Sequence, residues 1–478
     1  MDEEESNTPI PFGISAATGR PIEGVSEKDL NALLGKDDQA SASLVKALAY
    51  KVTEANFGVL SGFDADKLDE VGWGLIFSAE VDPAPLLEAL SPLVERRRAE
   101  AGDRFKIFQG ADGYRVGDTA NKWLMRRGAS LNIIDPDLGV PYYLVVVGDP
   151  SQIPFSFQYS LDIVAGVGRI DFPTTAEYRQ YAESVVAHES DLALATMREI
   201  AMFATCHDFD RATQLFTNQV AKPLAFGEGP KKSIGDKFGF KVNALFEDAA
   251  TKENLMGVLR GAERGTPSIL FTGSHGMAFA ADDARLANNQ GALVCNDWPG
   301  YGSIGESHWF AASDVPADAS IHGMIHFFFA CYGAGTPEFD NFNRMGQPQR
   351  VAPHAMTARL PQALMAHPGG GTLASLGHID KAWASSFQSQ RGKAQTQGFR
   401  DVVGQLMIGT RVGQATDQFN TQWGTLSTEL LELLDERSAG GEVSDAALLS
   451  LWIARDDARN YVILGDPAVK LRAQAAAA

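Results

Sequence analysis

Two segments decide the fold: Pro267-Ser-Ile-Leu-Phe-Thr-Gly-Ser-His-Gly276 and Gly323-Met-Ile-His-Phe-Phe-Phe-Ala-Cys331. Each is a short, nearly continuous apolar run, which is typical of a strand buried on both faces of a parallel sheet. Each run leads directly to a reactive side chain, His275 or Cys331. Because ligands bind to open α/β sheets where the carboxyl ends of the strands meet, these two ends predict a site.

A cysteine and a histidine at one edge of a sheet can hydrolyse amides and esters. The thiolate attacks the carbonyl carbon, and the histidine takes up a proton and returns it. Gly276 has no side chain, so its N–H, together with that of Cys331, predicts an oxyanion hole. The alternative is that Cys331 is a buried and inert cysteine, which is the usual state of a cysteine that closes a strand.

A strand ending in His-Gly, followed one crossover later by a strand ending in Ala-Cys, resembles the caspase, legumain and gingipain clan of cysteine peptidases. Further segments, in this order, resemble the gingipain-like branch, and the resemblance spans about Val71 to Leu471. These segments are Tyr142-Tyr-Leu-Val-Val-Val-Gly-Asp-Pro150 with Ile153-Pro154, Val167-Gly-Arg-Ile170, Leu364-Met-Ala-His-Pro-Gly-Gly-Gly-Thr-Leu-Ala374, and Tyr461-Val-Ile-Leu-Gly-Asp-Pro-Ala-Val-Lys-Leu471.

The resemblance implies a caspase-like (caspase-haemoglobinase) fold of mostly parallel sheets flanked by helices. It also implies a cysteine endopeptidase with a Cys331–His275 dyad, acting on protein or peptide substrates and controlled by an activating partner or a regulatory cleavage. In gingipain-like enzymes an acidic residue ahead of the Gly-Arg strand binds the basic residue that precedes the cleaved bond. Asp162 occupies about that place, which predicts cleavage after Arg or Lys; a loop aspartate or a structural cap is the alternative. Asp297 and Trp298, on the loop after the histidine, are the other predicted substrate-binding residues.

The pattern of helices, strands and breakers predicts an α/β chain with two α/β subdomains and an N-terminal helical region. The expected boundaries are 1–65 for the helical accessory region, 66–226 for the first subdomain, 227–472 for the catalytic subdomain and 473–478 for a disordered tail. Gly227-Glu-Gly-Pro-Lys-Lys232 has the composition of a linker between the two subdomains.

Composition narrows the class of protein. The 478 residues are 45% hydrophobic and 21% charged, which is ample for a large core, and no apolar run approaches the about 20 residues of a membrane span. The acidic start and three scattered cysteines predict a cytoplasmic protein without a disulfide framework. The net charge of −19 argues against nucleic acid as a partner. We expect no membrane partner, cofactor or metal.

Two other functions fit the same residues. One is a catalytically silent scaffold of peptidase fold, in which the N-terminal region binds partners; the intact His-Gly and Ala-Cys pairs argue against it. The other is a cysteine hydrolase of small amides or esters. Neither accounts for the ordered motifs as well as an endopeptidase does.

Overall fold

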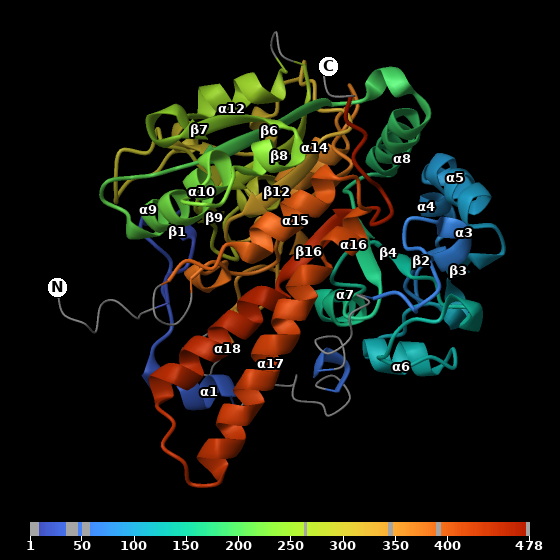
Figure 1. Cartoon of the computed structure of the whole chain (residues 1–478), viewed down its shortest axis with the longest axis horizontal. Helices are drawn as coiled ribbons and strands as arrows, with labels where there is room; N and C mark the ends of the chain where they lie inside the picture. Colours follow the sequence, from blue (N-terminus) through green and yellow to red (C-terminus); the bar gives the residue numbers. More distant parts are fainter. Residues whose placement is uncertain are drawn as a thin grey trace.

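The computed structural model describes residues 9–34, 46–49, 58–261, 265–342, 348–388 and 393–474. Its centre is a ten-stranded sheet (Figure 1). The strands, in their order across the sheet, are β3 (Phe105–Phe108), β2 (Trp73–Ile76), β4 (Tyr143–Val147), β5 (Gly166–Ile170), β16 (Tyr461–Gly465), β15 (Ala374–His378), β12 (Ile325–Phe329), β8 (Pro267–Gly273), β6 (Met197–Ala204) and β7 (Lys241–Phe246).

The two strands expected from the sequence lie side by side in this sheet. β12 pairs in parallel with β8, and Phe329 lies opposite Gly273, so both strands end at the same edge. β15 is antiparallel to β16, whereas the other paired strands of this sheet are parallel. The prediction of a mostly parallel sheet that brings His275 and Cys331 to one edge is confirmed.

Side chains of β12 alternate between two buried layers, one on each face of the sheet. Ile325, Phe327 and Phe329 pack in the larger layer, and Phe328 packs in the layer under α12 (Lys252–Leu259) and α14 (Arg359–Met365). The helices are α1 (Leu30–Leu34), α3 (Leu68–Val71), α4 (Ala84–Ala89), α5 (Ser91–Ala101), α6 (Ala120–Met125), α7 (Phe155–Asp162), α8 (Thr175–Ser190), α9 (Arg211–Phe216), α10 (Lys222–Phe226), α11 (Ile234–Phe238), α12 (Lys252–Leu259), α13 (Leu286–Asn289), α14 (Arg359–Met365), α15 (Gln397–Met407), α16 (Val412–Ala415), α17 (Asp417–Ser438) and α18 (Asp445–Arg459).

The sheet runs across the boundary expected between 226 and 227. β6, from the expected first subdomain, lies between β8 and β7, and β16, from the expected second, pairs with β5. At the tail, residues 475–478 lie outside the described part. Ala473, however, forms a parallel β-bridge with Thr196, and the N–H of Gln474 donates to the carbonyl oxygen of Thr196. These two residues of the expected disordered tail are therefore held by backbone contacts.

The N-terminal region is helical only in part. α1 packs against α18 through Leu30 and Leu33, near the long α17–α18 hairpin that projects from the sheet (Figure 1). Residues 13–15, however, form a strand, β1 (Gly13–Ser15), in a second sheet of order β1-β9-β10-β11. Its other strands are β9 (Gly276–Ala278), β10 (Leu293–Val294) and β11 (Trp309–Phe310), and a separate pair joins β13 (Gly335–Thr336) to β14 (Met356–Thr357). The chain just before and within β1 thus reaches the expected active site.

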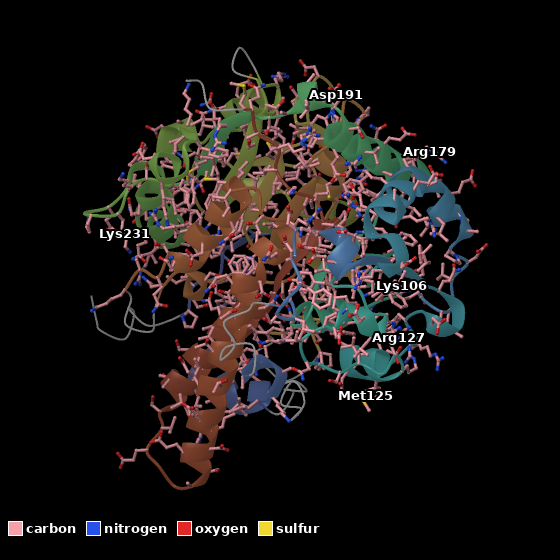
Figure 2. The ribbon with its side chains drawn as sticks, turned by 45° about the vertical axis from the view of Figure 1, so that its right-hand side comes forward. Lys106, Met125, Arg127, Arg179, Asp191 and Lys231 are labelled. Carbon is pink, nitrogen blue, oxygen red and sulfur yellow. The ribbon has the colours of Figure 1, made fainter. Side chains whose placement is uncertain are left out.

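The two outer strands of the large sheet carry lysines. Lys106 lies on β3 and Lys241 on β7, and charged side chains on an edge strand oppose pairing with another molecule. Figure 2 shows Lys106 and Arg127 on one side of the molecule and Lys231, between α10 and α11, on the opposite side. Among the described helices, none has the length and apolar character needed to cross a membrane.

Candidate active site

Cys331 follows β12 after a single residue, and the backbone turns sharply behind it. Tyr332 has a φ of 59°, a left-handed conformation that costs energy for a residue with a side chain, and its N–H donates to the carbonyl oxygen of Asp380. The Cys331 Sγ accepts the N–H of Ala382 at 3.2 Å. The thiol is buried, and burial raises its pKa. Cys331 is therefore held between the ends of β12 and β15.

His275 is oriented by an aspartate that the sequence analysis did not find. Its Nε2 lies 2.8 Å from Oδ2 of Asp210, the residue that caps α9 and accepts the N–H of Thr213. Tyr301 donates its hydroxyl to the other oxygen, Oδ1, at 3.0 Å. Burial acts to raise the pKa of Asp210, but the charge and hydrogen bond of His275 and the hydrogen bonds of Thr213 outweigh it, so this pKa lies well below its usual range.

This contact engages one of the two ring nitrogens of His275. Nε2 is engaged by Asp210, and the buried Nδ1 has no hydrogen-bond partner within the described residues. Nδ1 is therefore the ring nitrogen available for a contact with a bound molecule. The only local signal for Asp210 was the run Asp210-Arg-Ala-Thr213, in which an aspartate starts a helix and the threonine three positions later donates to it.

Gly276 and Cys331 direct their backbone N–H groups at one oxygen. The N–H of Gly276 donates at 2.9 Å, and that of Cys331 at 3.0 Å, to the carbonyl oxygen of Phe12. A Cβ on Gly276 would lie only 1.9 Å from the carbonyl oxygen of Cys331, so this close approach requires glycine. The geometry is that of two donors converging on a carbonyl beside a thiol.

The three predicted substrate-binding residues lie in three different places in the structure. Asp162 ends α7, before a strand three places from β12 in the sheet, and its carboxylate accepts from the N–H of Val167 and from Nδ2 of Asn420. Asp297 is exposed and accepts the N–H of Lys252 at the start of α12. Trp298 is buried, with its ring centroid 5.6 Å from that of Tyr301, the partner of Asp210. Trp298 thus borders the histidine side of the site.

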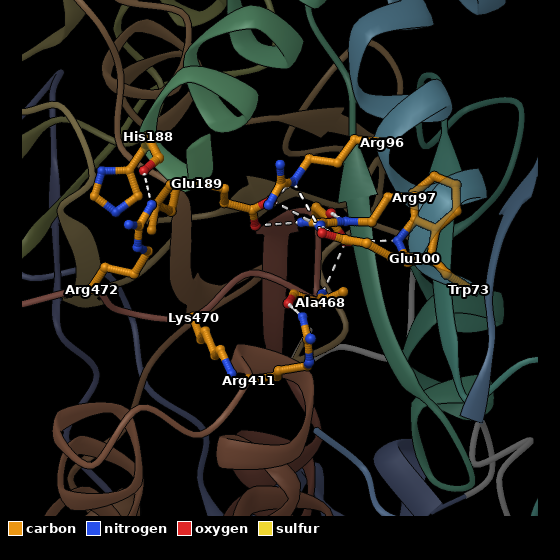
Figure 3. A network of polar contacts seen from close by, with 12 residues as sticks. Trp73, Arg96, Arg97, Glu100, His188, Glu189, Arg411, Ala468, Lys470 and Arg472 are labelled. Carbon is orange, nitrogen blue, oxygen red and sulfur yellow. Dashed lines mark hydrogen bonds and ion pairs between the residues drawn. The ribbon is translucent and has the colours of Figure 1, made fainter. Parts of the chain in front are cut away.

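The Gly-Asp-Pro motif near the end of the chain has a structural role. Asp466 is fully buried and accepts from Trp73 Nε1 at 2.9 Å and from Arg97 Nε at 2.7 Å. Arg97 also pairs with Glu189 of α8 at 2.6 Å (Figure 3). The motif therefore ties the strand end of β16 to β2, α5 and α8.

The earlier Gly-Asp-Pro turn is held by the arginine of the Val-Gly-Arg-Ile segment. Arg169 is fully buried and donates at 2.6 Å to the carbonyl oxygens of Gly148 and Ile153. Its Nε donates to Gln158 at 2.9 Å. Two of the segments that carry the resemblance thus contact each other and brace the fold.

A family model for peptidase family C25 matches residues 123–472, most of the chain. This chain belongs to peptidase family C25. Its family makes it a cysteine-type peptidase, a hydrolase related to the gingipains, and the expectation drawn from the motifs is confirmed. The comparison with curated proteins gives no match.

Solved structures with a similar fold include two of gingipain R. The crystal structure of the Arg-specific cysteine proteinase gingipain R (RgpB) aligns with a TM-score of 0.48 and 13% identity, over 84% of this chain and 78% of that chain. The complex of the pro- and mature domains of RgpB from Porphyromonas gingivalis aligns with a TM-score of 0.46 and 13% identity, over 84% and 80%.

Proposed function

We propose that this C25 peptidase is an endopeptidase that cleaves peptide bonds in proteins with Cys331 as nucleophile and His275 as proton carrier. The observation that carries the proposal is the convergence of the Gly276 and Cys331 N–H groups on one carbonyl oxygen beside the Cys331 thiol. An amide held in this way has its carbonyl polarised where the negative charge of the tetrahedral intermediate develops.

Each group has a defined part in the reaction. The sulfur of Cys331 attacks the carbonyl carbon, and the two N–H groups hold the resulting oxyanion. Nδ1 of His275 gives its proton to the leaving amine, and Asp210 stabilises the imidazolium through Nε2. Within the described residues no hydrogen bond joins the thiol to the imidazole, which supports a histidine that acts mainly on the leaving group.

The proposal includes a preference for arginine or lysine before the cleaved bond, and this part of it rests on the resemblance alone. The described contacts of Asp162 and Asp297 are with backbone N–H groups and an asparagine, so neither lends support to it. Control by an activating partner or a regulatory cleavage, and a cytoplasmic location, are likewise proposed from the sequence.

A peptide library varied at the residue before the cleaved bond tests the function. Each peptide carries a fluorogenic leaving group, and the wild type is compared with Cys331→Ala and with Cys295→Ala as a control for another buried cysteine. We expect peptide hydrolysis that is lost in Cys331→Ala and kept in Cys295→Ala. If the chain hydrolyses simple esters but no peptide, the result would favour the hydrolase of small amides or esters. If it hydrolyses neither esters nor peptides, the result would favour the silent scaffold.

A further inference from the structure

The N-terminal segment crosses the active site in an extended conformation. The N–H of Phe12 donates to the carbonyl oxygen of Ala382 at 2.8 Å, and the carbonyl oxygen of Ile10 accepts from Ala384 at 3.1 Å. Pro11, between them, forms an antiparallel bridge with Trp383. This is strand addition, the way in which an extended peptide binds to an exposed backbone edge.

The same segment places one peptide bond at the reacting groups. The carbonyl oxygen of Phe12 is the atom that accepts both the Gly276 and the Cys331 N–H. The sulfur lies beside the next residue, because a Cβ built on Gly13 would be 3.1 Å from the Cys331 Sγ. Beyond this point the chain continues as β1, paired with β9 in the register Gly13 to Gly276. The bond between Phe12 and Gly13 therefore lies where a substrate bond would lie.

The side chain of Phe12 occupies an aromatic pocket. It is 0% exposed, and its ring centroid lies 4.9 Å from that of Phe329, 5.8 Å from those of Phe387 and His275, and 6.2 Å from that of Phe216. An arginine in this place would bury its guanidinium among the rings. Attraction to their faces would offset only part of the lost hydration.

We propose, on the basis of the proposed nucleophile and fold but in place of the arginine or lysine preference, that residues 10–13 are bound as the enzyme's own substrate: the pocket selects a large apolar, aromatic side chain, and Cys331 cleaves the Phe12–Gly13 bond. The Phe12 carboxylate would then be the end of a released peptide and Gly13 the new start of the chain. The Cys331 thiol is buried, with Gly13 close to its sulfur, and burial raises its pKa, so the thiol forms the reactive thiolate less readily while the segment is in place.

The step balances with the groups present and one water molecule. The Cys331 thiol releases its proton to water as the sulfur bonds to the carbonyl carbon of Phe12, and His275 takes up a proton from water. The C–N bond to Gly13 breaks as His275 gives that proton to the Gly13 nitrogen. Water then hydrolyses the thioester, which frees the Phe12 carboxylate and restores the thiol.

The first test compares two fluorogenic peptides built from the segment, acetyl-Ile-Pro-Phe-coumarin and acetyl-Ile-Pro-Arg-coumarin, on the full chain. We expect kcat/KM for the phenylalanine peptide to exceed that for the arginine peptide by at least about 100-fold. Preference for the arginine peptide, lost in Cys331→Ala, would overturn this inference while the proposed function stood. Failure to hydrolyse either peptide or any protein would overturn both.

The second test follows the mass of the purified chain over time. We expect wild type to lose residues 1–12, at a rate independent of protein concentration, and Cys331→Ala to stay intact. Phe12→Leu keeps an apolar side chain and should be cleaved, whereas Phe12→Asp places a carboxylate among the rings and should not be; circular dichroism checks that both variants are folded. An intact wild-type chain that hydrolyses the phenylalanine peptide, or cleavage at another bond, would overturn the self-cleavage.

Discussion

Replacement of Asp210 by asparagine tests how the histidine is held. The change keeps the size of the side chain but removes the charge 2.8 Å from Nε2 of His275. A hydrogen bond to a charged group contributes about 1.5–3 kcal/mol, and Asp210 makes this bond to the histidine that transfers the proton in the proposed reaction. If this energy is lost from the transition state alone, kcat should fall roughly 10- to 150-fold with KM unchanged.

The assay is steady-state hydrolysis of the best fluorogenic peptide by wild type, Asp210→Asn and Tyr301→Phe. Tyr301→Phe removes the hydroxyl 3.0 Å from Oδ1 and leaves the contact with His275, so its loss should be at most about 10-fold and smaller than that of Asp210→Asn. A kcat for Asp210→Asn within about threefold of wild type, or a change in KM alone, would refute the orienting role of Asp210.

The remaining predictions concern stability and the glycine of the site. Because the pKa of Asp210 is lower in the folded chain than in the unfolded chain, its charged carboxylate stabilises the fold above the ordinary carboxylate pKa of about 3.9, and this stabilisation is lost as the pH falls toward the folded value. In urea titrations, the difference in unfolding free energy between wild type and Asp210→Asn should therefore be smaller at about pH 3 than at about pH 7. A difference that does not change with pH would contradict this. Gly276→Ala should lower kcat/KM by at least about 100-fold, because the added methyl group meets the carbonyl oxygen of Cys331. Gly257→Ala, where the added methyl group would lie in open space, should leave kcat/KM unchanged. Equal kcat/KM values for Gly276→Ala and wild type would count against the oxyanion hole. Asp466→Asn should lower the urea-derived unfolding free energy by about 1.5–3 kcal/mol, since it removes one of the charges paired with the buried Arg97 while Glu189 remains. A loss below about 0.5 kcal/mol would show that this carboxylate is dispensable.

The strands and the reactive pair could be predicted because they leave a strong local signal. Apolar runs of the length of β8 and β12 are recognisable in one sequence, and the rule that parallel strands share an edge brings His275 and Cys331 together without further information. The position of Gly276 beside this pair could be predicted for the same reason, since it directly follows His275.

Asp210 and Phe12 could not be predicted because their roles depend on contacts distant in sequence. Asp210 lies 65 residues before His275 and looks like an ordinary helix cap. Phe12 contacts the site through backbone hydrogen bonds and ring contacts to residues far away in the sequence, and neither leaves a signal in the residues around it. Asp162 is the opposite case, in which a position in the sequence carried the prediction. Its position relative to Arg169 suggested a binding residue, but its carboxylate accepts the N–H of Val167 at the start of the same strand, as the structural alternative foresaw.

The most direct test of the account is to map the cysteine that reacts with a peptide acyloxymethyl ketone, a probe that forms a thioether with the nucleophile of cysteine peptidases. The chain has three cysteines, all free, so digestion and mass spectrometry can tell them apart. The account predicts that the probe modifies Cys331 in proportion to lost peptide hydrolysis and that His275→Ala is labelled more slowly. Modification of Cys206 or Cys295 with the same loss of activity, or peptide hydrolysis that persists in Cys331→Ala, would contradict it.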